Sequence, residues 1–240
     1  MKILAIDSTA KAASAALAND EKVLSYFVAD NGLTHSEILL PMAEAVCKSA
    51  CATWEDIDLF AVTVGPGSFT GVRIGVGTVK GLAEECLTPP KANCVGVSTL
   101  EALAENLFPL DGVYAAVMDA RRGEVYNALF RAENGTLLRL CDDRAISLAD
   151  LGKELTEKYG EESIRLCGDG YDVAMAALAP LPLRLVPTPP LLRLQNAASI
   201  ARVAYRAAER GEAVPPTALA PVYLRLPQAE RDRLAKEKKL

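Results

Sequence analysis

Hydrophobic and polar positions follow two different periods along the first hundred residues. Residues 2–7 and 59–64 are nearly continuous apolar runs, as in strands that are covered on both faces of a sheet. Between 34 and 50 the apolar residues instead recur with the spacing of an amphipathic helix. The whole pattern predicts strands at 2–7, 14–20, 22–30, 59–64 and 93–98, and helices at 34–50, 69–85 and 99–107.

The predicted helix at 34–50 carries its own start signal. Thr34 and Glu37 form a T-x-x-E capping box, in which each residue satisfies a backbone amide that the first helical turn leaves unpaired. Pro41 lies inside the helical pattern, where a proline removes one backbone hydrogen bond. We therefore expect Pro41 either to kink the helix or to mark its true start.

The second half of the chain repeats the element order of the first. The apolar segment 112–119 ends in Asp119, just as segment 2–7 ends in Asp7, and each is followed by a short turn and two more strands. A helix, a strand and another helix come next, so the order strand–Asp–turn–strand–strand–helix–strand occurs twice. This repetition predicts an internal duplication, with Asp7 and Asp119 in equivalent places.

The predicted helix at 69–85 contains glycine at positions 71, 75, 77 and 81. Each glycine in a helix interior costs roughly 0.5–1 kcal/mol relative to alanine. On a helical wheel, a valine face that suits the protein's own sheet is separate from a stripe of small residues with Ile74 beside it. The stripe consists of Gly71, Gly75, Thr78 and Leu82. Such a stripe lets a second helix approach closely, either the chain's own helix at 34–50 or that of a partner.

Composition restricts the class of protein. Half of the 240 residues are apolar and 24% are charged, which is ordinary for a globular chain. No apolar run approaches the ~20 residues that span a bilayer, and Asp7 interrupts the first run too early for a signal peptide. The six cysteines are scattered without a C-x-x-C pair, as in a reducing compartment. We therefore expect a cytoplasmic protein that does not bind a membrane.

The net charge of −5 argues against independent, tight binding of nucleic acid, which needs a concentrated basic surface. The one basic stretch is the tail at 225–240, with six Lys or Arg against three Asp or Glu. A short basic tail is more often solvated than functional, and its contact with a polyanion is left open.

Seven segments resemble the TsaB family, also called YeaZ, within the actin-like superfamily. They are ILAIDSTA at the start, HSEILLP, VGPGSFTGVRIGV, KGLA, GVSTLEALA, MDARRGEVY and the late PVYLR. The resemblance implies an α/β actin-like fold (sugar kinase/Hsp70/actin, RNase H-like) of two duplicated subdomains. It further implies subdomains at 1–109 and 110–224, a basic tail at 225–240, and a helix at 195–210 that packs back on the first subdomain.

The same resemblance implies a function without catalysis. A TsaB-like protein is a subunit required for N6-threonylcarbamoyladenosine formation next to the anticodon of tRNA, and it binds and activates a TsaD-type transferase. A TsaE-type ATPase joins the complex, tRNA is involved only indirectly, and a homodimer uses the same surface when the partner is absent. The expected interface residues are His35, Ile38, Leu39, Met42, Gly71, Arg73, Ile74, Gly75, Thr78 and Leu82.

The residues themselves are poor in catalytic groups. His35 is the one histidine, so the two imidazole ligands of an iron or zinc site are missing and we expect no metal. The turns DSTAKAAS and DARRGEVY have few glycines, although phosphate-binding turns need close approach of the backbone. No cofactor is expected, with nucleotide considered only within the complex. The weak candidates for such a contact are Asp7, Ser8, Thr9, Asp119 and Arg121.

The segment GPGSFTG, residues 65–71, allows two interpretations. A glycine-rich turn before a helix is suitable for an anion, but the lysine and spacing of a P-loop are absent. We favour a tight corner in which Ser68 and Thr70 cap the helix. Two alternatives to the docking subunit stay open, an autonomous actin-fold ATPase or phosphotransferase and a plain homodimeric structural protein.

Overall fold

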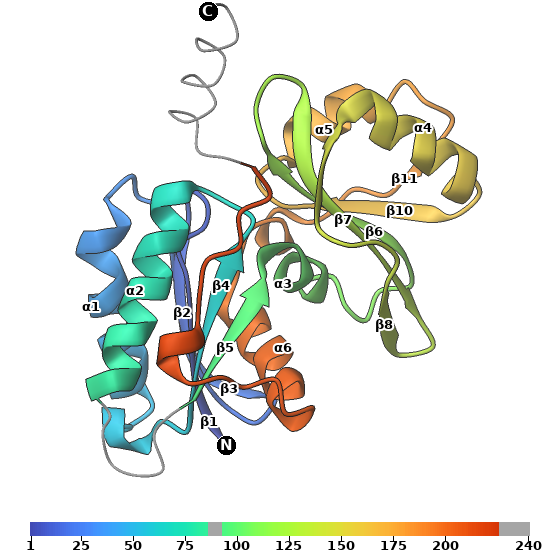
Figure 1. The fold of residues 1–240 in the computed structure, drawn as a ribbon. Coiled ribbons are helices and arrows are strands. Elements are labelled where there is room, and N and C mark those ends of the chain that lie inside the picture. Colours follow the sequence, from blue (N-terminus) through green and yellow to red (C-terminus); the bar gives the residue numbers. More distant parts are fainter. Residues whose placement is uncertain (86–92, 226–240) are drawn as a thin grey trace, which may run out of the picture.

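The computed structural model describes residues 1–85 and 93–225 and contains two mixed sheets (Figure 1). Cys86 and all of the basic tail except Arg225 lie outside these ranges. In the first sheet the strand order is β3-β2-β1-β4-β5. Its strands are β1 (Lys2–Asp7), β2 (Ala13–Asn19), β3 (Lys22–Ala29), β4 (Leu59–Gly65) and β5 (Asn93–Ser98).

When the additional strand β9 is left out of the count, the second sheet has the same internal order, because β8-β7-β6-β10-β11 is then again third, second, first, fourth and fifth strand of its half. In both halves the first two strands are antiparallel and the first and fourth are parallel. The predicted duplication is therefore confirmed. The strands are β6 (Gly112–Asp119), β7 (Glu124–Glu133), β8 (Thr136–Arg139), β10 (Ser163–Cys167) and β11 (Arg184–Leu185), and β9 (Arg144–Ser147) pairs with β7.

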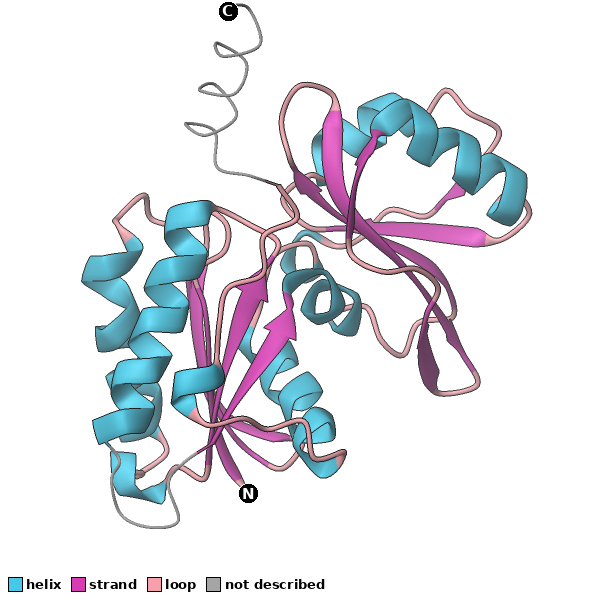
Figure 2. Cartoon of the chain, viewed as in Figure 1, coloured by secondary structure: helices cyan, strands magenta, loops and turns pink. Residues whose placement is uncertain are grey.

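Each sheet is covered by helices on both faces (Figure 2). On the first sheet, α1 (His35–Ser49) and α2 (Phe69–Glu85) cover one face and α6 (Ala197–Glu209) covers the other. On the second sheet, α4 (Leu148–Tyr159) and α5 (Tyr171–Leu178) cover one face, while α3 (Thr99–Glu105) covers the other. The halves therefore exchange helices, since α3 comes from the first half of the chain and α6 from the end of the second. The subdomain boundaries at 109 and 224 stay a prediction.

Local signals set several helix starts. The Glu37 carboxylate accepts hydrogen bonds from the Thr34 amide at 3.3 Å and the Thr34 hydroxyl at 2.6 Å, so the predicted capping box is present. Ser98 caps α3 and Asn196 caps α6, each by accepting a hydrogen bond from a backbone amide in the first turn of its helix. The helix α1 runs through Pro41 without ending, so Pro41 does not mark its start.

After α6 the chain crosses the first subdomain as a strap, residues 213–225, which includes the short helix η3 (Pro216–Ala218). Val214 and Cys94 exchange two backbone hydrogen bonds of 2.8 Å beside β5. Leu219 is only 4% exposed and belongs to the core beneath α1 and α2. At its end, Arg225 forms a 2.5 Å ion pair with Glu124 of β7, so the strap also contacts the second subdomain.

Candidate functional site

The turn between β1 and β2 is fastened to its own subdomain. Asp7, Ser8 and Thr9 are at most 1% exposed. The Asp7 carboxylate accepts hydrogen bonds from the hydroxyls of Thr9, at 2.8 Å, and Thr63, at 2.7 Å. Burial raises the pKa of Asp7, and these hydrogen bonds only partly oppose the rise. Three of the five side chains considered for nucleotide contact, Asp7, Ser8 and Thr9, thus hold β1, β4 and α2 together.

The corner at 65–71 is packed against this same turn. The Thr9 carbonyl accepts a hydrogen bond from the Ser68 amide at 2.8 Å, and the Ser68 hydroxyl accepts one from the Gly71 amide at 3.3 Å. Ser68 therefore caps α2 as predicted, whereas Thr70 already lies inside the helix. A side chain at Gly67 would overlap Thr9. The corner is closed by the chain's own backbone.

Two members of the stripe on α2, Gly71 and Gly75, face inward, which corrects our interpretation of these two residues. A Cβ on Gly71 would overlap the Ser8 carbonyl oxygen, and a Cβ on Gly75 would lie 2.7 Å from the Ser8 hydroxyl oxygen. These two glycines let the β1–β2 turn approach the helix; they do not admit a second helix. Gly77 and Gly81 instead lie on the exposed side, with nothing within 4 Å of an added Cβ.

The expected interface residues divide by burial. Leu39 and Met42 are 1% and 8% exposed and pack in the core with Val72 and Val76, so they offer almost no side-chain surface to a partner. Arg73 is exposed. Five of the expected residues on α1 and α2 are partly buried: His35, Ile38, Ile74, Thr78 and Leu82. The Nε2 atom of His35 lies 3.2 Å from the Lys11 carbonyl oxygen, which ties α1 to the β1–β2 turn.

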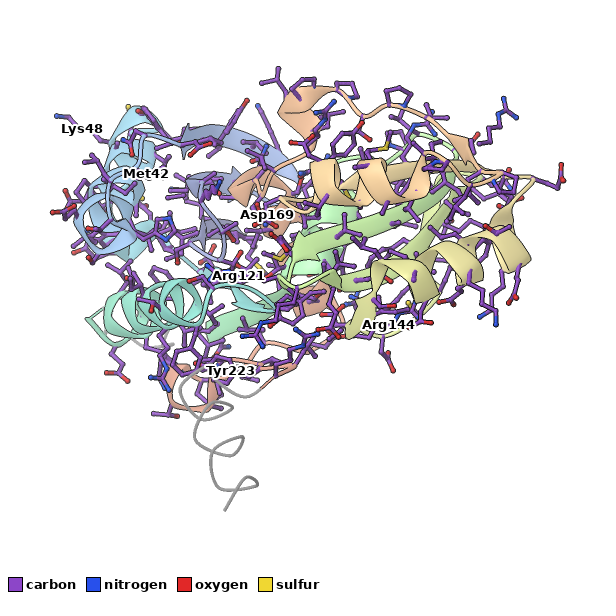
Figure 3. The ribbon with its side chains drawn as sticks, turned by 90° about the horizontal axis from the view of Figure 1, so that it is seen from above. Met42, Lys48, Arg121, Arg144, Asp169 and Tyr223 are labelled. Carbon is purple, nitrogen blue, oxygen red and sulfur yellow. The ribbon has the colours of Figure 1, made fainter. Side chains whose placement is uncertain are left out.

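A second group of polar residues lies where the two halves meet, around Asp169 and Arg121 (Figure 3). Arg121 and Arg122 adopt left-handed backbone angles, φ 63° and 58°, in the β6–β7 turn. The Asp119 carboxylate accepts a hydrogen bond from the Arg121 amide at 2.7 Å. Desolvation, together with the negative charges of Asp119 and Asp7, raises the pKa of Asp169 to about 6.

The structure therefore places Asp7 and Asp119 at the ends of the equivalent strands β1 and β6, as the duplicated order predicts, and Asp169 lies near enough to both for their charges to act on it. Sequence reasoning missed Asp169, although the sequence Gly168-Asp169-Gly170 after β10 was a signal. Gly168 has φ +110°, and a side chain there would overlap the Val117 carbonyl. Within residues 1–85 and 93–225, no group of three or more His, Cys, Asp or Glu residues is arranged to hold a metal ion. No helix of these ranges is long and apolar enough to cross a membrane.

Comparison with known proteins identifies the family. Residues 31–224 match the family TsaD, tRNA N6-adenosine threonylcarbamoyltransferase. The Bacillus subtilis (strain 168) protein "tRNA threonylcarbamoyladenosine biosynthesis protein TsaB" is 36% identical over 158 residues, which are 66% of this chain and 67% of that protein. The Escherichia coli (strain K12) protein of the same name is 41% identical over 138 residues, 56% of this chain and 58% of that protein. The chain belongs to the TsaB family.

A solved TsaB-family structure supports the same assignment. YeaZ from Pseudomonas aeruginosa superposes with a TM-score of 0.77 at 27% identity, covering 93% of this chain and 99% of that one. Together with the duplicated sheet order, this confirms the actin-like fold class expected from the sequence. The relatives of the TsaB family named above are biosynthesis proteins of tRNA threonylcarbamoyladenosine.

Proposed function

We propose that the protein is a subunit required for N6-threonylcarbamoyladenosine formation in tRNA, and that it binds and activates a TsaD-type threonylcarbamoyltransferase without catalysing the reaction. Membership of the TsaB family supports the pathway. The surface proposed for docking, hereafter the docking face, is the exposed side of α1 and α2. It contains Leu40, Arg73, Gly77 and Gly81, flanked by Ile38 and Ile74.

The observation that carries the docking role is the position of Gly77 and Gly81. Both lie on the exposed side of α2, and a Cβ added at either would have no other part of the described chain within 4 Å. Internal packing therefore gives no reason for two residues that each weaken a helix by roughly 0.5–1 kcal/mol. Glycines four positions apart let another helix approach closely along this side. A partner helix laid across them explains both.

The proposal that the chain is not itself catalytic rests on the β1–β2 turn. Both oxygens of Asp7 accept hydrogen bonds from Thr9 or Thr63, and Ser8 donates to the Gly71 carbonyl at 2.8 Å. The amide of Thr9 donates to Asp7 and its carbonyl accepts from Ser68, so the backbone of this residue is not free to hold a phosphate. Asp119 and Asp169 are the observation that favours the alternative, an autonomous ATPase or phosphotransferase, because two carboxylates face the junction of the halves.

The experiment is size-exclusion chromatography with light scattering on the protein alone and with TsaD purified from the same source. We expect a homodimer alone and a one-to-one heterodimer with TsaD, and no ATP turnover by the protein itself. The heterodimer should increase threonylcarbamoyl transfer to tRNA relative to TsaD alone, in the presence of a TsaE-type ATPase. Failure to form any complex, with or without nucleotide and TsaE, would reject the docking role.

A further inference from the structure

Three side chains form a stacked cluster where the strap passes the start of α2, hereafter the shelf: Phe69, Arg73 and Tyr223. The rings of Phe69 and Tyr223 have centroids 4.7 Å apart and planes inclined by 31°. The Arg73 guanidinium carbon lies 3.9 Å from the centre of the Phe69 ring. Its Nε donates a hydrogen bond to the Tyr223 hydroxyl at 3.0 Å. Figure 3 shows Tyr223 at the rim of the molecule, away from Asp169.

The strap holds the shelf rigidly. The Val222 amide donates to the Val64 carbonyl at 2.7 Å, directly beside Tyr223. Gly65 has φ +126°, and a side chain there would overlap the Val222 carbonyl oxygen. Leu219 anchors the strap in the core four residues earlier. A contact surface that is fixed before binding loses little conformational entropy when a partner arrives.

The positive charge of Arg73 is not balanced by a carboxylate in the described part of the chain. Ion pairs with carboxylates are formed by seven other arginines in the described ranges, for example Arg131, Arg144 and Arg206. Arg73 is exposed, and among residues 1–85 and 93–225 it has no carboxylate within 4.0 Å. The Nε of Arg73 donates to Tyr223, and its two terminal nitrogens form no hydrogen bond within the described part of the chain. A guanidinium with free terminal nitrogens is suited to bind a carboxylate through two parallel hydrogen bonds.

We propose that the shelf forms the end of the docking face at the start of α2 and binds an Asp or Glu side chain of the TsaD-type partner. The proposal rests on the proposed function and adds two things to it, the chemistry of the partner group and a role for the C-terminal strap. Arginine and tyrosine in a preformed cluster are the residue types in which binding energy concentrates. Val222, which precedes Tyr223 in the strap and is 50% exposed, adds apolar surface next to the shelf.

A protein carboxylate fits this site better than RNA does. A nucleobase binds by stacking on a free aromatic face. The Phe69 ring already contacts Arg73 and Tyr223, so it is less available for stacking on a base. The shelf also continues the exposed side of α2 on which Gly77 and Gly81 lie, so a helix seated on these glycines extends to Arg73.

The test compares Arg73→Met, Tyr223→Phe and Arg184→Met, each in the full chain, by measuring Kd for TsaD with calorimetry. Arg184 is an exposed arginine on β11 of the second sheet and serves as the matched control. We expect Arg73→Met to weaken binding by about 30-fold or more. Tyr223→Phe should weaken it by about 3- to 10-fold, because it removes only the hydroxyl that orients Arg73. Arg184→Met should bind as the wild type does.

Circular dichroism of each variant checks that the fold is kept. Wild-type affinity in Arg73→Met would overturn the inference while leaving the proposed function intact; absence of a wild-type complex would instead reject the proposed function. A loss in Arg73→Met with no change in Tyr223→Phe would exclude the strap and overturn the inference. So would unchanged TsaD affinity combined with weaker tRNA binding by the Arg73→Met complex, which would assign the shelf to RNA.

Discussion

The Ser8 carbonyl oxygen occupies the position that a Cβ on Gly71 would take, while the Ser8 hydroxyl donates to the Gly71 carbonyl at 2.8 Å. The first turn of α2 and the β1–β2 turn are therefore in backbone contact. Two glycines of α2 serve this contact, and two others are open to solvent. The four glycines of α2 thus fall into two pairs in different surroundings, and substitution can distinguish the two pairs.

Alanine at position 71 should destabilise the protein, because the added methyl group overlaps a backbone oxygen that cannot rotate away. We expect a loss of about 1–3 kcal/mol in the free energy of unfolding. Gly77→Ala should instead gain roughly 0.5–1 kcal/mol from helix propensity alone. Urea unfolding followed by circular dichroism measures both. Equal effects of the two substitutions would contradict the inward placement of Gly71.

Leucine at position 77 should block TsaD binding without unfolding the chain. The site is exposed and nothing lies within 4 Å of a Cβ there, so the monomer tolerates the side chain. A partner helix that approaches along Gly77 and Gly81 would be pushed away. Light scattering of the mixture should show the two proteins separately. The control is Thr156→Leu on α4, where the backbone is helical, and it should leave the heterodimer intact. Gly135→Leu would not serve as a control, because Gly135 has φ +72° and a leucine there would strain the backbone.

Leu219→Ala should cost about 2–5 kcal/mol, since it removes a buried side chain from the core beneath α1 and α2. Hydrogen exchange should also accelerate at Val214 and Val222, whose amides pair with Cys94 and Val64. Leu191→Ala is the control, because Leu191 is 91% exposed. Its effect should stay within about 0.5 kcal/mol. A Leu219→Ala protein as stable as the control would show that the strap is not part of the core.

The stability of the protein should depend on Asp169 through pH. Its pKa is about 6 in the folded protein, against an ordinary value of 3.8. The folded state therefore binds the proton more strongly, so this group lowers the free energy of unfolding as pH rises from about 4 to 6. Asp169→Asn cannot ionise. It should be more stable than the wild type at pH 8, with the difference shrinking toward pH 4; a constant difference across this range in urea unfolding would refute the assignment.

The element order was predictable because the apolar periods are unambiguous in β1, β4, β6 and α1, and because Thr34 and Glu37 provide a capping signal at the start of α1. The equivalent positions of Asp7 and Asp119 at the ends of β1 and β6 followed from the repeated order. The short strand β9, residues 144–147, was missed, since four residues of mixed polarity give no period.

The glycine stripe shows what a helical wheel cannot give. The wheel correctly separates Val72 and Val76 from Gly71 and Gly75, yet it has no information on the turn that lies against the second pair. Only the folded position of Ser8 reveals that contact. The shelf could not be predicted from the sequence for the same reason, because Arg73 and Tyr223 are 150 residues apart along the chain. Contacts of this kind depend on the path of the strap, which no local pattern encodes.

The strap also has a consequence for synthesis. A ribosome delivers residues 1–85 first, yet the core beneath α1 and α2 closes only when Leu219 arrives, and the opposite face of the first sheet stays uncovered until α6 emerges. The nascent amino-terminal half therefore exposes apolar surface until residues 197–219 have been made. We expect chaperone binding during translation, and sensitivity to stop codons that fall before position 219, from this order of synthesis.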